Sequence, residues 1–261
     1  MKLTVVKIGG NVIDDENLLK AFLKDFSQLP SPKILIHGGG KIATQIAKKL
    51  SIETVMIEGR RVTDQAMLDV VTMVYGGLVN KKIVAQMQSL QNNAIGLTGA
   101  DGGAVLSQKR NPNPIDYGYV GDIKTVNVEF INSLLLQNIV PVFAPLTHDN
   151  EGNILNTNAD TQAQAIAQAL TKLYEVTLVY CFEKKGVLRD INDENSVITH
   201  INPEIYQNLK SENVIFEGMI PKLDNAFKAI NEGVQKVLIC HAEAIKTACT
   251  NQPLGTLLQK N

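Results

Sequence analysis

The chain has 261 residues, of which 44% are hydrophobic and 20% charged, and its formal net charge is −1. This length suits one or two domains with a buried core, and the balanced charge argues against a strongly basic nucleic-acid-binding or membrane-binding surface. An odd number of cysteines and the absence of both a signal peptide and a roughly 20-residue apolar run favour a reduced, cytoplasmic protein. We therefore expect a small-molecule site, with no nucleic-acid or membrane partner.

Short β-branched runs alternate with amphipathic stretches, a pattern typical of a parallel sheet covered by helices. The first two predicted units each consist of a strand, a glycine turn and a helix: 3–8, Gly9–Gly10 and 15–26, then 33–37, Gly38–Gly40 and 41–50. Two such turns at one edge of a parallel sheet direct backbone N–H groups toward the same crevice. The pair, with Lys7 beside it, favours a site for phosphate.

A dinucleotide site is the competing interpretation of the second turn. Residues 38–43, GGGKIA, match the pattern G-x-G-x-x-(G/A), and Glu58 lies 20 residues beyond Gly38. This fingerprint normally follows the first strand of its domain, whereas here another glycine turn comes first. An NAD(H) enzyme is thus a minor alternative.

One long helix is expected from Asp64, its N-cap, to about Gln91. Gly76 and Gly77 inside it indicate a bend or a close packing contact. The apolar stripe fits the core or a subunit contact; its members are Met67, Val70, Val71, Val74 and Leu78.

The remaining segments complete an α/β pattern. Residues 104–127 predict β-hairpins on one edge of the sheet, and the later elements are expected over 139–145, 161–173, 176–181, 203–210, 218–232 and 236–240. Together they predict a three-layer αβα sandwich with a largely parallel central sheet. Two lobes, residues 1–174 and 175–261, share that sheet, and the hairpins belong to the N-terminal lobe.

Six motifs in this order resemble the amino acid kinase family and, within it, the N-acetylglutamate kinases of arginine biosynthesis. They are 7-KIGG-10, 37-HGGG-40, 59-GRRVTD-64, 96-GLTGADGG-103, 156-NTNAD-160 and 218-GMIPK-222. The resemblance runs from residue 2 to about 257. It implies transfer of the γ-phosphoryl group of ATP to the γ-carboxylate of N-acetyl-L-glutamate, giving N-acetyl-L-glutamyl 5-phosphate. Mg²⁺ would be carried on the nucleotide phosphates, so no dedicated metal site is expected.

The resemblance also implies catalytic roles for three residues. Lys7 and Lys222 would stabilise the transition state from opposite lobes, and Asp160 would orient the two lysines. Phosphoryl transfer to a carboxylate brings two anions together, so cations that neutralise the equatorial oxygens answer its main requirement. Asp160 is not expected to be a general base, because the attacking carboxylate is already ionised at pH 7.

Substrate and nucleotide contacts follow from the same resemblance. Arg61 would bind the α-carboxylate, Asn156 the α-substituents, and the backbone of Gly39 and Gly40 the γ-carboxylate or the transferred group. The nucleotide residues would be Gly9, Gly10, Gly186, Val187 and Leu188. The loop 181-CFEKKGVL-188 departs from the family pattern, so Lys184 and Lys185 are interpreted equally well as phosphate ligands or as solvated side chains.

Several alternatives stay open. Nothing in the motifs distinguishes an N-acetyl from an N-succinyl group, and a non-catalytic arginine-sensing module is a further reading, disfavoured by the presence of Lys7, Asp160 and Lys222. A homodimer joined through the helix of residues 64–91 is expected. In the family that the chain resembles, the arginine-inhibited hexamers carry an extra helix before the first strand. The first strand is predicted here at about Leu3, so the resemblance implies an enzyme that arginine does not inhibit.

Overall fold

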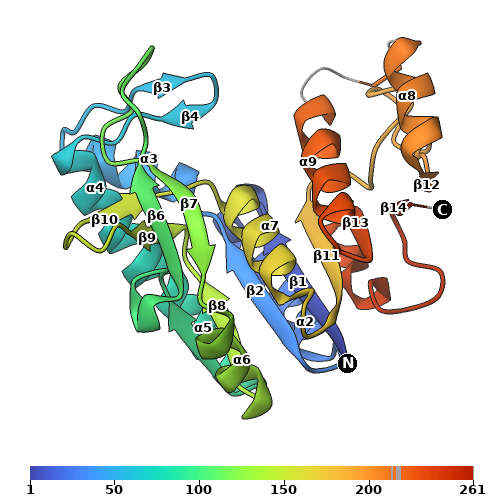
Figure 1. The fold of residues 1–261 in the computed structure, drawn as a ribbon, viewed down its shortest axis with the longest axis horizontal. Coiled ribbons are helices and arrows are strands. Elements are labelled where there is room, and N and C mark those ends of the chain that lie inside the picture. The colour runs from blue at the N-terminus through green and yellow to red at the C-terminus, as the bar shows by residue number, and fades with distance from the viewer. Residues whose placement is uncertain (213, 216–218, 261) are drawn as a thin grey trace.

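A twisted sheet runs through the molecule, which we describe from a computed structural model covering residues 1–212, 214–215 and 219–260 (Figure 1). Its eight strands follow the order β12-β14-β13-β11-β1-β2-β8-β5. The strands of this sheet are β1 (Lys2–Ile8), β2 (Lys33–His37), β5 (Ala94–Leu97), β8 (Val140–Phe143), β11 (Glu175–Phe182), β12 (His200–Ile201), β13 (Lys236–His241) and β14 (Thr256–Leu258).

All neighbouring strands in this sheet are parallel except β13 and β14. The predicted largely parallel sheet is therefore confirmed. β1 lies between β2 and β11, so the segments before and after residue 174 contribute to one continuous sheet.

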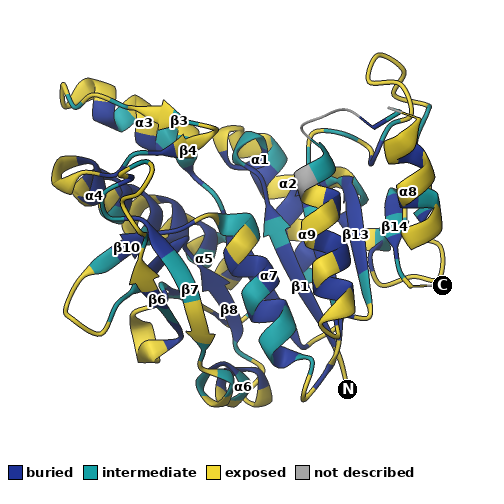
Figure 2. Cartoon of the chain, turned by 45° about the horizontal axis from the view of Figure 1, so that its top comes forward, coloured by how far each residue is buried: buried dark blue, intermediate teal, exposed yellow. Residues whose placement is uncertain are grey.

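Helices cover both faces of the sheet, which confirms the three-layer αβα sandwich. Along β1, Val6 and Ile8 belong to one buried cluster, whereas Leu3 and Val5 belong to the other, as expected for alternating side chains of a strand buried on both faces. Figure 2 shows the central strands buried beneath helices whose outer sides are exposed. The helical elements on the first face are α1 (Gly10–Asp14), α2 (Glu16–Ser27), α3 (Gly40–Lys49), α4 (Gln65–Val71), η1 (Thr72–Val79), α5 (Asn80–Ser89) and η4 (Ala242–Thr247), and those on the second are α6 (Val128–Leu136), α7 (Ala159–Leu170), α8 (Pro203–Ser211) and α9 (Ile220–Asn231).

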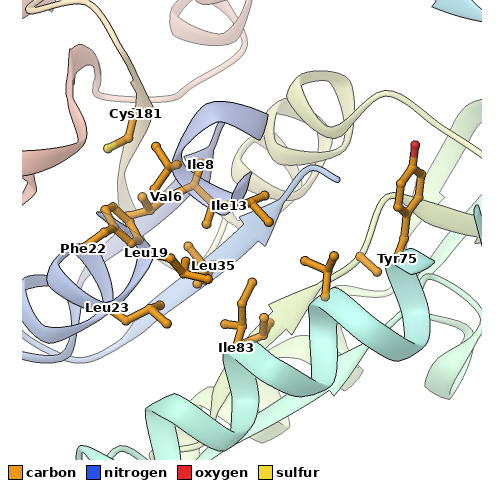
Figure 3. Close-up of a cluster of buried hydrophobic side chains, with 14 of the residues drawn as sticks. Val6, Ile8, Ile13, Leu19, Phe22, Leu23, Leu35, Tyr75, Ile83 and Cys181 are labelled. Carbon is orange, nitrogen blue, oxygen red and sulfur yellow. The ribbon is translucent and has the colours of Figure 1, made fainter. Parts of the chain in front are cut away.

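The first cluster packs α2 directly against the sheet. Figure 3 shows Phe22 and Leu23 of α2 beside Val6 and Leu35 of the sheet, and these side chains are at most 1% exposed. Burial of such apolar side chains contributes about 1.5–3 kcal/mol each and fixes the positions of the strand ends.

The long helix is confirmed, with a change of geometry in its middle. The Asp64 side chain caps it by accepting a hydrogen bond from the Met67 N–H at 2.8 Å, and α4, η1 and α5 follow without a break. η1 is π-helical and contains Gly76 and Gly77. Leu78 is 41% exposed, so it is not a core residue, whereas the other four residues of the apolar stripe are buried.

The hairpins lie where expected along the chain but do not extend the main sheet. β6 (Val105–Lys109) and β7 (Gly121–Val126) pair antiparallel, and they join β9 (Leu146–His148) and β10 (Ile154–Asn156) in a separate four-stranded sheet. β3 (Met56–Ile57) and β4 (Arg60–Arg61) form a further small hairpin. The prediction of hairpins at the edge of the main sheet is therefore wrong, because half-exposed strands such as β7 are unsuited to a sheet covered on both faces.

Some boundaries also differ from expectation. α7 begins at Ala159 rather than at residue 161, and α9 begins at Ile220. Gly218 of the sixth motif lies outside the described residues.

None of the helices in the described part of the chain has the length and apolar character that a membrane crossing requires.

Candidate active site

The two glycine turns lie side by side at the carboxyl ends of β1 and β2. Ile8 is opposite His37 in the parallel register, and a methyl group added at Gly38 would lie 3.8 Å from the Gly10 nitrogen. Gly39 has a φ of +152°, and a Cβ there would come within 2.9 Å of the Tyr75 ring. A glycine is thus required at residue 39 both by the backbone conformation and by the close approach of η1.

Arg61 lies in a cavity of about 450 Å³ together with Gly39 and Gly40. The residue is 9% exposed, and its guanidinium donates from Nη2 to the Gly40 carbonyl oxygen and to Thr44 Oγ1, both at 2.9 Å. The contact attaches hairpin β3–β4 to the start of α3. A buried, fixed guanidinium beside backbone N–H groups is suited to a carboxylate ligand.

Asn156 is attached to the Arg61 strand through Thr63. The Asn156 side-chain amide donates to Thr63 Oγ1 at 3.0 Å, and the Thr63 hydroxyl donates to the Arg61 carbonyl oxygen at 3.2 Å. Both Arg61 and Asn156 line the same cavity. Thr63 is buried and was given no role from sequence, although it stands inside the third motif.

A second cavity, of about 510 Å³, holds the three residues expected to be catalytic. Lys7 Nζ lies 2.8 Å from Asp160 Oδ1, with the two side chains 16% and 33% exposed. Asp160 stands in the first turn of α7, where the Asn158 side chain accepts hydrogen bonds from the N–H groups of Asp160 and Thr161 at 2.9 and 3.0 Å. The helix cap therefore places the carboxylate that holds Lys7.

Lys222 faces the same cavity but is held differently from Lys7. Its Nζ lies 4.6 Å from the centroid of the Phe182 ring, a cation–π distance. Within the part of the chain that the structure describes, no carboxylate lies within ion-pair distance of Lys222. The structure thus brings Asp160 together with Lys7 but not with Lys222.

Tyr180 is a further residue of this cavity that sequence reasoning missed. Its hydroxyl donates to the Asp160 carbonyl oxygen at 3.4 Å. Burial raises the pKa of Tyr180, and the nearby charge of Asp160 raises it further, so the hydroxyl stays protonated. The position follows from the register of β11, in which Tyr180 pairs with Lys7.

A third, smaller cavity of about 220 Å³ contains Gly186, Val187 and Leu188. It has Phe182 and Lys222 in common with the 510 Å³ cavity, and that cavity has four residues in common with the first: Gly59, Arg60, Asn158 and Thr161. The three cavities therefore adjoin in series, with the lysines in the middle.

The other residues considered for nucleotide binding lie in different surroundings. The Gly9 N–H donates to the Cys181 carbonyl oxygen at 3.0 Å and so is already paired. Lys184 lines the smaller cavity with its Nζ 3.3 Å from Glu194, whereas Lys185 lines a different groove. The described residues contain no group of three or more His, Cys, Asp and Glu side chains placed to hold a metal ion.

Two charged residues of the first cavity were not predicted. Arg110 on the hairpin loop donates to Asp122 on β7, with Nε 3.1 Å from Oδ1. The sequence shows an arginine and an aspartate at these positions. Their ion pair could not be predicted, because it depends on the register in which the two strands of the hairpin pair.

Comparison with known proteins shows the family. The model of the amino acid kinase family matches residues 2–241. The chain is 57% identical to the acetylglutamate kinase of Cytophaga hutchinsonii, over 100% of this chain and 99% of that protein. It is 54% identical to the acetylglutamate kinase of Bacteroides fragilis, over 94% of each chain.

Solved structures with this fold agree. A Streptococcus mutans protein is 27% identical with a TM-score of 0.76, and 99% of each chain is covered. An N-acetylglutamate synthase from Neisseria gonorrhoeae, complexed with coenzyme A and N-acetyl-glutamate, has a TM-score of 0.84 at 20% identity, and the match covers all of this chain and 60% of that one. Carbamate kinase from Giardia lamblia bound to AMP-PNP has a TM-score of 0.72 at 12% identity over 100% and 99% of the two chains. The last two show the fold alone.

Proposed function

The chain belongs to the amino acid kinase family, and on that premise we propose that it phosphorylates the γ-carboxylate of N-acetyl-L-glutamate with ATP, giving N-acetyl-L-glutamyl 5-phosphate for arginine biosynthesis. Relatives that share half or more of its residues include the acetylglutamate kinases of Cytophaga hutchinsonii and Bacteroides fragilis. The observation that carries the proposal is the series of three cavities, with Arg61 in the first and Lys7 and Lys222 in the second.

In the proposed reaction a γ-carboxylate oxygen attacks the γ-phosphorus. The bond from phosphorus to the β,γ-bridging oxygen breaks, and ADP leaves with the electron pair. No proton is transferred, because the attacking carboxylate is already ionised. The protein therefore acts by positioning two anions in line and by neutralising charge on the equatorial oxygens.

Lys7 and Lys222 supply that charge from β1 and α9. The ion pair with Asp160 holds the Lys7 ammonium at the cavity, while Lys222 lies over the Phe182 ring at the junction of the second and third cavities. A cation over an aromatic ring remains able to donate to an anion on its other side. In this proposal the Lys222 ammonium contacts the γ-phosphoryl group as it passes from ATP to the substrate carboxylate.

The substrate end uses the glycine turn and the fixed guanidinium. Arg61 binds the α-carboxylate, Asn156 contacts the α-substituents, and the N–H groups of Gly39 and Gly40 approach the γ-carboxylate. These residues share one cavity, and Thr63 fixes the separation of Arg61 from Asn156. The kinase is favoured over an NAD(H) enzyme because the amino acid kinase family model matches residues 2–241.

ATP occupies the end of the series that Gly186, Val187 and Leu188 line. Gly10 lies near its phosphates, whereas the Gly9 N–H is already paired with the Cys181 carbonyl oxygen and does not bind them. Mg²⁺ would accompany the nucleotide, because the donor groups here are lysines and backbone amides, which suit phosphate oxygens and not a metal ion. When bound, it neutralises phosphate charge.

Lys222→Ala tests the proposal. Wild-type protein with MgATP and N-acetyl-L-glutamate is expected to form an acyl phosphate that hydroxylamine traps as a hydroxamate, and Lys222→Ala is expected to abolish it, because half of the transition-state cation pair is lost. Lys228→Ala, an exposed lysine in the last turn of the same helix, is the matched control and should retain activity. Absence of trapped product from the wild type would overturn the proposal.

We also propose that the enzyme is a cytoplasmic homodimer joined through the helix of residues 64–91. Met73 and Leu78 on η1 are 55% and 41% exposed. η1 is a π-helix, in which each hydrogen bond joins residues i and i+5. Met73 and Leu78 are five residues apart, so they lie on the same side of the helix. Exposed apolar residues aligned in this way are suited to a subunit contact.

A further inference from the structure

One cation of the substrate cavity is left without a partner in the proposed substrate. Arg60, Arg61 and Arg110 all line this cavity. Arg61 is assigned to the α-carboxylate, and Arg60 lies where this cavity adjoins the cavity of Lys7. N-acetyl-L-glutamate has two carboxylates, which Arg61 and the glycine turn accommodate, so Arg110 requires another explanation.

Arg110 is held firmly in place. Its Nε donates to both oxygens of Asp122, at 3.1 and 3.3 Å, and its Cζ lies 5.4 Å from the centroid of the Tyr117 ring. Its side chain is only 20% exposed. Among residues 1–212, 214–215 and 219–260, Nη1 has no hydrogen-bond partner. Asp122 thus occupies the Nε and Nη2 edge of the guanidinium and leaves three N–H donors, two on Nη1 and one on Nη2.

Backbone pairing places Arg110 across residues 119–120 from Asn156. The Asn156 N–H donates to the Tyr119 carbonyl oxygen at 2.9 Å, and the Arg110 N–H donates to the Val120 carbonyl oxygen at 2.8 Å. The segment at residues 119–120 therefore runs between Asn156 and Arg110. Two inter-strand spacings of about 4.8 Å separate their backbones by roughly 10 Å.

This order predicts how an N-acyl group lies in the cavity. Asn156 contacts the α-substituents, so the acyl chain extends from there past Val120, which also lines the cavity. An acetyl group ends near Val120. A succinyl group carries a carboxylate carbon about 2.5 Å farther along the chain by standard bond lengths, toward the long Arg110 side chain.

We propose that Arg110 is a specificity-determining residue for the acyl end, and that the enzyme accepts, besides N-acetyl-L-glutamate, an N-acylglutamate whose acyl chain ends in a carboxylate, N-succinyl-L-glutamate being the probe. This inference rests on the proposed function. A guanidinium already fixed by Asp122 and Tyr117 loses little conformational entropy when it binds a second carboxylate.

A purely structural role for Arg110 makes a different prediction. Arg110 and Asp122 join the two strands of one hairpin, and a cross-strand ion pair contributes to stability whatever the substrate. A structural role would therefore lower the thermal stability of a variant and affect all substrates alike. A specificity role changes the ratio between substrates.

The wild-type enzyme provides the first test. With MgATP, turnover of N-acetyl-, N-succinyl- and N-succinamoyl-L-glutamate is compared; the last has a neutral carboxamide in place of the terminal carboxylate. We expect kcat/KM for the succinyl substrate to be at least tenfold above that for the succinamoyl substrate. Turnover of the acetyl substrate alone would overturn this inference and leave the proposed function intact, whereas no turnover of any substrate would overturn both.

Variants test the residue. Arg110→Leu is expected to lower the succinyl-to-acetyl ratio of kcat/KM at least tenfold, while Lys109→Leu, the neighbouring exposed cation, leaves the ratio unchanged. A ratio that falls with Arg60→Leu instead of Arg110→Leu would overturn the assignment to Arg110. Thermal unfolding of each variant identifies a folding defect, and the wild-type comparison holds even if Arg110→Leu fails to fold.

Discussion

His37 shows how one buried residue supports the glycine turn. It is fully buried, its Nε2 accepts a hydrogen bond from the Asn80 side-chain amide at 3.1 Å, and its Nδ1–H donates to the Gly38 carbonyl oxygen at 2.7 Å. Burial lowers the pKa of His37 to about 4, the Gly38 hydrogen bond opposes that shift, and the nearby Lys81 cation favours it. The neutral ring is therefore the form that fits between η1–α5 and the turn.

The pH dependence of stability follows from this pKa. Because the folded-state pKa lies below the unfolded value of about 6.5, protonation favours unfolding as the pH falls from about 6.5 through about 4. The free energy of unfolding should fall by about 2 kcal/mol from this group between pH 7.5 and 5. Urea titrations of the wild type and His37→Asn measure it.

The expected result is a flatter pH dependence in His37→Asn than in the wild type. Identical slopes in the wild type and His37→Asn would show that this ring does not titrate with unfolding.

Motifs located most of the site residues, but not those that depend on pairing between distant strands. Arg61 and Asn156 stand in quoted motifs and do lie in one cavity. Thr63, which connects them, and Arg110 with Asp122 could not be assigned, because their roles depend on strand register. A one-residue slip would turn each side chain to the other face of the hairpin.

At the scale of elements, the N-cap of α7 positions the Asp160 carboxylate, which we propose to be catalytic. Asn158→Ala removes the acceptor for the N–H groups of Asp160 and Thr161. We expect it to lower the free energy of unfolding by about 1 kcal/mol. It should also lower kcat severalfold, because Asp160 loses the cap that places it beside Lys7.

Asn202→Ala separates these two effects. Asn202 caps α8 by accepting from the Ile205 N–H at 2.8 Å, away from the three cavities. It should cost similar stability while leaving kcat unchanged. An equal loss of kcat in both variants would mean that global stability, and not the position of Asp160, sets the activity.

Element types were easier to predict than element geometry. The alternation of strands and helices follows from apolar periodicity, and the Asp64 cap was visible in the sequence. The π-helical geometry of η1 was not, because the change of hydrogen-bond partner depends on packing against Gly39 and the sheet. The same change turns Leu78 outward, contrary to the helical stripe assigned from sequence.

At the scale of the whole molecule, the parallel sheet shared by both halves of the chain was predicted, but its strand order was not. Strands that are buried on both faces have similar apolar sequences whatever their position in a parallel sheet. The sequence therefore did not reveal that β11 lies beside β1. The predicted lobe boundary at residue 174 therefore falls within a continuous sheet.

The subunit contact is the prediction that concerns the whole molecule. We expect the wild-type protein to have a mass of twice 28.5 kDa in solution. Met73→Glu combined with Leu78→Glu should give a folded monomer, because two charges would be buried without partners in the proposed contact. Light scattering measures the mass, and circular dichroism verifies the fold.

Leu136→Glu is the matched control, since Leu136 is 65% exposed at the end of α6, on the face of the sheet opposite η1. If exposed apolar area alone drove association, this substitution would dissociate the dimer as well. If the η1 stripe is the contact, only the Met73 and Leu78 pair will do so. A monomeric wild type, or a dimer that survives both charges on η1, would contradict the proposed contact.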